Sequence, residues 1–171
     1  MANKNRIVIA LLVYVAAIGL LISASGAQEH MSGYADEILD IHKALLAAHL
    51  ANSTKGVLAA EADTILVVGR GEVHLASKEE RTQQFALYLE RSEFEQYRDV
   101  IPPIIRVSAD GTMGWLIAQV QIVGAETGDD GERVPIESTW AWIELYEKRE
   151  GRWVRVGEVS SLKPSRADRI E

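Results

Sequence analysis

Four long β segments fill the second half of the sequence, and they limit the fold more than any other feature. Each is rich in β-branched and aromatic residues, and together they cover residues 94–108, 113–123, 134–147 and 153–162. Turn-forming or acidic sequences separate the last three, at residues 109–111, 124–131 and 149–151. Pro102-Pro103 lies inside the first segment and must sit at an edge, a bulge or a break. The pattern predicts an antiparallel meander.

Helices precede this meander. Residues 35–50 carry Ile38, Ile41, Leu45 and His49 at spacings of three and four, which predicts an amphipathic helix. Asn52-Ser53 interrupts it, and Ser53 is a suitable N-cap for a short helix through residues 57–59.

A β-hairpin and a third helix follow the short one. Residues 64–68 and 72–75 flank Gly69-Arg70-Gly71 and predict the hairpin. Ser77 and Glu80 have the spacing of a capping box, which opens a helix that ends near Ser92. The order of elements predicts an α+β domain with helices packed on one face of a curved sheet.

The N-terminal segment predicts export. Lys4 and Arg6 precede an apolar run over residues 7–22, and small residues follow up to Ala27. This order is typical of a secretory signal peptide cleaved after Ala27. An uncleaved anchor is the alternative, and both place the domain outside the membrane, in the periplasm or secreted. The predicted organisation is a signal segment (1–27), one domain (28–164) and a polar tail (165–171).

Charge and composition exclude several classes of function. The net charge is -7, and all 25 acidic residues follow residue 27. Without a basic cluster the domain is a poor partner for nucleic acid, and membrane contact is expected only through the N-terminal segment. The sequence has no cysteine, which excludes disulfides and thiolate chemistry. No histidine or acidic cluster has metal-ligand spacing, so we predict no metal and no cofactor.

Three stretches resemble the NTF2-like superfamily, and within it the SnoaL-like and DUF4440-type domains. They are the helix break between Ala44 and Thr64, the turn Ala76-Ser77-Lys78-Glu79-Glu80, and a terminal hairpin with Thr139-Trp140-Ala141-Trp142, Gly151-Arg152-Trp153-Val154 and Glu158-Val159-Ser160-Ser161. The resemblance covers residues 35–164. It implies a cystatin-like cone, in which a curved antiparallel sheet wraps over the N-terminal helices.

The resemblance also implies a pocket at the open end of the cone. Members of the superfamily include isomerases, dehydratases and polyketide cyclases, and also binding or oligomerisation domains without catalysis, so the fold does not assign an activity. Steroid-isomerase-like members hold an oxyanion with a tyrosine and a protonated aspartate. This chain departs from that pattern because its pocket-facing helix offers His42 and His49 instead.

Three residues are candidates for acid–base catalysis. His42 lies seven residues before His49, so the two share a helix face. Either histidine is a proton donor or base aimed into the cone, or both are satisfied at the boundary between helix and sheet. Asp63 is a buried acid or a turn acid. Glu158 interrupts the apolar positions Val154 and Val156 and is the best candidate for a pocket acid.

Six further residues are candidates for ligand binding: His49, Tyr97, Trp115, Gln119, Trp140 and Trp142. Trp140 and Trp142 share one strand face and form the wall of an apolar site or an interface buried in a dimer. Gln119 shares a face with Trp115.

Three functional hypotheses remain from the sequence. The first is an exported domain that binds a small apolar molecule and forms a homodimer through its sheet. The second is an acid–base enzyme of isomerase, dehydratase or cyclase type, acting on an apolar carbonyl compound with His42, Asp63 and Glu158. The third is an interaction or oligomerisation module whose cone is filled by its own side chains.

Overall fold

A helix over residues 32–50 opens the computed structural model, which describes residues 32–163. The domain itself begins at Ala35. The predicted signal segment and the polar tail at 165–171 lie outside the described residues. Within residues 32–163, no helix combines the length and the apolar character that crossing a membrane requires.

The apolar stripe of this first helix faces the interior, as the sequence predicts. Ile38 and His42 are fully buried, and Leu45 and His49 expose less than a tenth of their surface. The side chains of both histidines therefore lie between the helix and the rest of the domain, which confirms the predicted orientation of the helix.

Two N-caps start the next helices. In α2 (Thr54–Val57) the Ser53 hydroxyl accepts a hydrogen bond from the amide of Gly56 at 3.2 Å. In α3 (Lys78–Arg91) the Ser77 hydroxyl accepts from the Glu80 amide at 3.2 Å, and the Ser77 amide donates to the Glu80 carboxylate at 2.7 Å. The predicted capping box is confirmed.

Seven strands complete the domain: β1 (Glu61–Gly69), β2 (Glu72–Ser77), β3 (Ser92–Asp99), β4 (Ile104–Val107), β5 (Met113–Thr127), β6 (Arg133–Arg149) and β7 (Arg152–Leu162). The predicted segment 94–108 breaks at Pro102-Pro103 into β3 and β4, as expected. The loop predicted at 124–131 is wrong at its start, because β5 continues to Thr127. Tertiary pairing with β3 and β6 extends the strand past Gly124.

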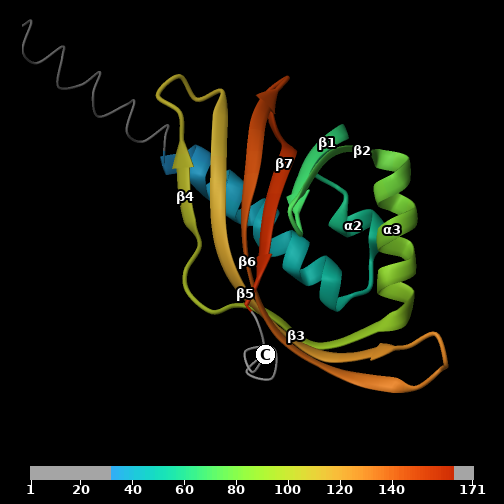
Figure 1. Ribbon diagram of the computed structural model, residues 1–171. Coiled ribbons are helices and arrows are strands. Elements are labelled where there is room, and N and C mark those ends of the chain that lie inside the picture. Colours follow the sequence, from blue (N-terminus) through green and yellow to red (C-terminus); the bar gives the residue numbers. More distant parts are fainter. Residues whose placement is uncertain (1–31, 164–171) are drawn as a thin grey trace, which may run out of the picture. The chain divides into compact units, whose positions relative to one another are not determined.

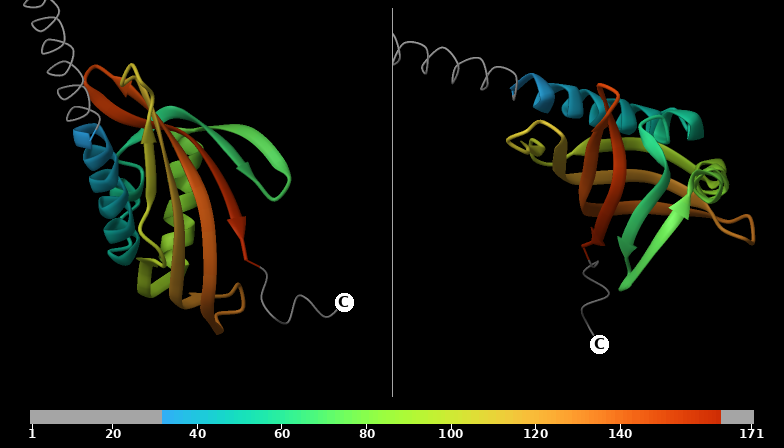
Figure 2. Two further views of the ribbon diagram at one scale, coloured as in Figure 1. Left: turned by 90° about the vertical axis from the view of Figure 1, so that its left-hand side faces the viewer. Right: turned by 90° about the horizontal axis from the view of Figure 1, so that it is seen from above.

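The strands form one sheet in the order β2-β1-β7-β6-β5-β3, and β4 also pairs with β5. The sheet curves, and the first helix lies across one of its faces (Figure 1, Figure 2). The α+β cone is confirmed, with one correction. The sheet is mixed, because β1 runs parallel to β7. This pairing connects the predicted hairpin to the far end of the meander.

A close approach between β3 and β5 accompanies the bend of the long β5–β6 hairpin, which passes beneath α3 (Figure 1). Phe94 pairs with Gly124, and the register shifts between Phe94 and Gln96, as in a β-bulge. A Cβ atom on Gly124 would lie 2.1 Å from the carbonyl oxygen of Glu93. Only glycine allows the two backbones to come this close.

We therefore predict that Gly124→Ala destabilises the domain by about 2 kcal/mol, because the added methyl forces β3 away from β5. Gly69→Ala is the matched control, since its Cβ would meet only the rotatable Ser160 hydroxyl, at 3.3 Å. Urea denaturation of both full-length variants, followed by circular dichroism, measures the difference. Equal midpoints for the two variants would contradict this account of the bend.

Candidate functional site

An irregularity in β7 brings two charged side chains to the concave face of the sheet. Tyr146 pairs with Arg155 and Glu144 pairs with Glu158, with a register shift between the two pairs. Arg155 and Glu158 are three residues apart, so a regular strand would place them on opposite faces. The extra residue in this β-bulge turns both toward the first helix.

These two residues belong to a charge cluster, which we define as Glu61, Arg81, Glu144, Arg155 and Glu158. Arg155 donates to Glu144 at 3.0 Å and also to Glu61. Arg81 donates to Glu61 at 2.8 Å, and it binds Glu158 in a bidentate pair at 3.2 and 3.1 Å. All members except Glu158 expose less than a twentieth of their surface. The cluster thus links β1, α3, β6 and β7 through buried ion pairs.

Its carboxylate partners hold Arg155 in the charged form. Burial alone would lower the pKa of Arg155, but Glu144, Glu61 and Glu158 together raise it above its ordinary value. Burial, followed by the Glu144 charge, raises the pKa of Tyr146. Tyr146 therefore stays protonated and donates to Glu144 at 2.7 Å. Both oxygens of Glu144 are thereby hydrogen-bonded.

We predict that Arg155→Met destabilises the domain by about 3–5 kcal/mol, because it leaves three carboxylates without their shared cation. Arg149→Met is the matched control. Arg149 pairs with Glu147 at the surface, where an ion pair contributes about 0–1 kcal/mol. Chemical denaturation of both variants tests the difference. A loss of stability no larger in Arg155→Met than in Arg149→Met would show that the cluster is not structurally important.

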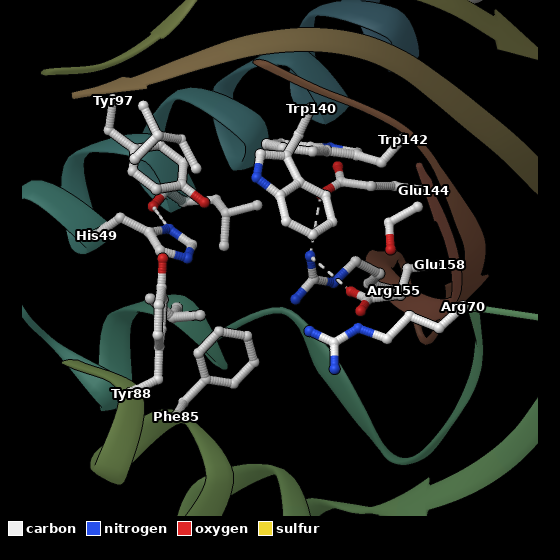
Figure 3. Close-up of a pocket in the computed structure, with 14 residues that line it drawn as sticks. His49, Arg70, Phe85, Tyr88, Tyr97, Trp140, Trp142, Glu144, Arg155 and Glu158 are labelled. Carbon is white, nitrogen blue, oxygen red and sulfur yellow. Dashed lines mark hydrogen bonds and ion pairs between the residues drawn. The ribbon is translucent and has the colours of Figure 1, made fainter. Parts of the chain in front are cut away.

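A cavity of about 280 Å³ opens beside the charge cluster (Figure 3). Most of its wall is apolar or aromatic, and its lining comprises Leu45, His49, Val57, Arg70, Phe85, Tyr88, Tyr97, Ile122, Trp140, Trp142, Glu144, Arg155, Glu158 and Ser160. In Figure 3, His49, Tyr88 and Tyr97 lie at one side of the cavity, and Arg70, Arg155 and Glu158 lie at the other. The cavity therefore has an aromatic end and a charged end.

His49 is a neutral hydrogen-bond acceptor at the aromatic end. Its Nδ1 donates to the carbonyl oxygen of Leu45 at 2.9 Å, so the proton resides on Nδ1 and Nε2 carries a lone pair. Tyr97 stacks on the imidazole with ring centroids 4.2 Å apart. Burial lowers the pKa of His49 from 6.5 to about 4. The ring is therefore uncharged at neutral pH.

Two tyrosines at the same end also stay protonated. Burial, with a smaller contribution from Glu126, raises the pKa of Tyr88 to about 12. Burial likewise raises the pKa of Tyr97, with Tyr88 as the next cause. Both phenols keep a hydroxyl that can donate and accept a hydrogen bond.

The lowered pKa of His49 predicts a pH-dependent stability. Between pH 6.5 and 4 the unfolded chain binds a proton at His49 and the folded chain does not, so stability falls as the pH falls through this window. The contribution is about 3 kcal/mol, fully present above pH 6.5. His49→Phe keeps an aromatic ring against Tyr97 and removes the titration. Urea denaturation from pH 7.5 to 4 should therefore give a smaller decline for the variant, and parallel declines would refute the shift.

Five of the predicted site residues line the cavity, namely His49, Tyr97, Trp140, Trp142 and Glu158. His42 does not line it. Its Nε2 lies 2.9 Å from an Asp99 carboxylate oxygen, and its Nδ1 lies 3.9 Å from Glu144. His42 is thus held at the boundary between helix and sheet, where the structural interpretation of the sequence placed it.

Three predicted site residues lie elsewhere. Asp63 is exposed on β1, whereas Glu61, two residues earlier, is buried. A regular strand would place both on one face, but the register of β1 against β7 shifts between Glu61 and Leu66. Trp115 and Gln119 pair with Leu145 and Ala141, on the face of the sheet opposite Trp140 and Trp142. The sequence did not show which face of β5 is buried, because both sets of alternating residues contain apolar side chains. In the structure the buried face carries Leu116 and Ala118.

Five charged residues of the cluster and the cavity were not among the predicted site residues: Glu61, Arg70, Arg81, Glu144 and Arg155. Arg155 lies between Val154 and Val156, and simple alternation along the strand places its side chain on the face opposite to that of Glu158. Arg81 lies in the first turn of α3, where a charged residue is typically solvated. Only the bulge in β7 and the packing of α3 against β1 bring them together. In residues 32–163 no group of histidine and acidic side chains has the geometry of a metal site.

No family model matches the sequence, and no curated protein matches it. Solved structures do match the fold. An NTF2-like protein from Cytophaga hutchinsonii is 19% identical, with a TM-score of 0.60, over 75% of this chain and 97% of that one. A ketosteroid isomerase-like protein from Erwinia carotovora atroseptica is 17% identical, with a TM-score of 0.60, over 77% and 97%.

A protein with a cystatin-like fold from Caulobacter vibrioides is 14% identical, with a TM-score of 0.59, over 77% of this chain and 91% of that one. At these identities the likeness establishes the fold alone. It does not single out the DUF4440-type or SnoaL-like domains within the superfamily.

Proposed function

We propose that this chain, whose fold is NTF2-like, binds a small apolar ring compound in the cavity between its helices and the concave sheet. The observation that carries the proposal is an open cavity of about 280 Å³ with aromatic walls. Apolar cavities of about 150 Å³ hold benzene, so this one has room for a two-ring molecule.

The state of the polar groups favours binding over catalysis. Of His42, Asp63 and Glu158, only Glu158 lines the cavity. Its carboxylate is engaged by Arg81 in a bidentate pair. With a pKa of about 4, His49 is a weak base near neutral pH. An acid–base enzyme is therefore the less supported hypothesis, and a cone filled by its own side chains does not agree with the cavity.

A pair of adjacent serines on β7 tests the proposal. Ser160 lines the cavity and pairs with Trp142, whereas Ser161 is exposed and pairs with Ala141 on the other face. Ser160→Phe should fill the cavity and weaken the binding of 2-naphthol by about tenfold or more. Ser161→Phe adds the same ring outside it and should leave binding unchanged.

Isothermal titration of 2-naphthol into the full-length protein and both variants measures the effect, and tryptophan fluorescence reports on Trp140 and Trp142. Denaturation midpoints show whether each variant is folded. If the unmodified protein does not bind 2-naphthol, the proposal is refuted. If the two variants bind it equally well, the cavity is not the binding site.

We further propose that the domain is exported and forms a homodimer through the outer face of its sheet. Export rests on the N-terminal sequence alone. The dimer is supported by Trp115, which is 38% exposed on that face, and by the exposed Met113 and Ile104 on the same face of β5 and β4. Both remain predictions.

A further inference from the structure

The two carboxylates at the cavity, Glu144 and Glu158, are already paired within the charge cluster. Glu144 accepts from Arg155 through one oxygen and from Tyr146 through the other. Glu158 accepts from Arg81 through both oxygens. A ligand that approached these acids with a cationic group would have to break a buried ion pair, which is costly.

Arg70 differs from these residues. It lies in the turn between β1 and β2, lines the cavity and is exposed. Figure 3 shows its guanidinium directed toward the cavity, near Arg155. Within residues 32–163, no carboxylate or other hydrogen-bonding group pairs with it. A planar guanidinium presents five donors that match the two oxygens of a carboxylate.

The opposite end of the cavity presents an acceptor. His49 Nε2 carries a lone pair, because Nδ1 holds the proton for the Leu45 carbonyl oxygen. Tyr88 and Tyr97 line the same end and add hydroxyl groups. Between the two ends lie Trp140, Trp142 and Phe85, whose rings offer apolar contact. Trp142 Nε1 is buried there without a hydrogen-bond partner among the residues that the structure describes.

We propose that the ligand is a ring compound with a carboxylate at one end, bound by Arg70, and a hydroxyl at the other end, bound by His49 Nε2. The inference rests on the proposed function and specifies the ligand class of the same cavity. An ammonium compound is disfavoured, because its charge would meet the guanidinium of Arg70, while the carboxylates at that end are already paired with Arg81 and Arg155.

Four probes with one ring system separate the contributions: 6-hydroxy-2-naphthoate, 2-naphthoate, 2-naphthol and 2-naphthylmethylammonium. Each is titrated into the full-length protein at neutral pH. The hydroxy acid should bind most tightly. Removal of its carboxylate should weaken binding about tenfold, and removal of its hydroxyl about fivefold. The ammonium compound should bind most weakly.

Two variants locate the contacts. Arg70→Ala should abolish the preference for 6-hydroxy-2-naphthoate over 2-naphthol, and Arg106→Ala, an exposed arginine on β4 outside the cavity, should preserve it. His49→Phe should abolish the preference for 6-hydroxy-2-naphthoate over 2-naphthoate. Arg70 is exposed, so Arg70→Ala is expected to fold, and its denaturation midpoint checks this.

The possible outcomes separate the two proposals. If no probe binds, the proposed function fails and the ligand class fails with it. If all four bind equally, the cavity binds ring compounds and the assigned ligand class is wrong. Tighter binding of the ammonium compound, or an equal loss in Arg70→Ala and Arg106→Ala, also overturns the assignment.

Discussion

The buried pairing of Arg155 with three carboxylates is the interaction on which the domain most depends. It joins β1 to the terminal strands, which are far apart in the chain, and Arg81 adds α3 by pairing with Glu61 and Glu158. Buried ions are tolerated only when each one is compensated, so the five side chains must be placed together or not at all. The bulge in β7 meets this condition because it turns Arg155 and Glu158 to one face.

The same pairing decides what the cavity can recognise. Glu144 and Glu158 are paired with arginines and a tyrosine, so neither is an isolated carboxylate in the cavity. Arg70 at one end, and His49 Nε2 with the hydroxyl groups of Tyr88 and Tyr97 at the other, remain available to a ligand. The charge cluster and the cavity are therefore linked. The ion pairs that stabilise the fold engage the same carboxylates that an acid–base reaction in the cavity would need.

Sequence reasoning succeeded where a signal was local. The capping box at Ser77, the break at Pro102-Pro103 and the inward stripe of the first helix were all predicted. It also placed Trp140 and Trp142 on one face, as in any regular strand, but left open whether that face lines a cavity or a dimer interface. It failed for Asp63 and for Trp115 with Gln119, whose burial depends on which face of β1 and β5 meets the helix.

The sequence by itself therefore determined the order of helices and strands, the α+β class and the shared face of Trp140 and Trp142, because hydrophobic periodicity and capping act within a few residues. Only the tertiary structure decided the parallel pairing of β1 with β7, the meeting of Arg81 with Glu61 and Glu158, and the position of Arg70 at the cavity. Ion pairs between residues 20 to 94 positions apart leave no periodic pattern in a sequence. One extra residue in a strand moves every later side chain to the other face of the sheet.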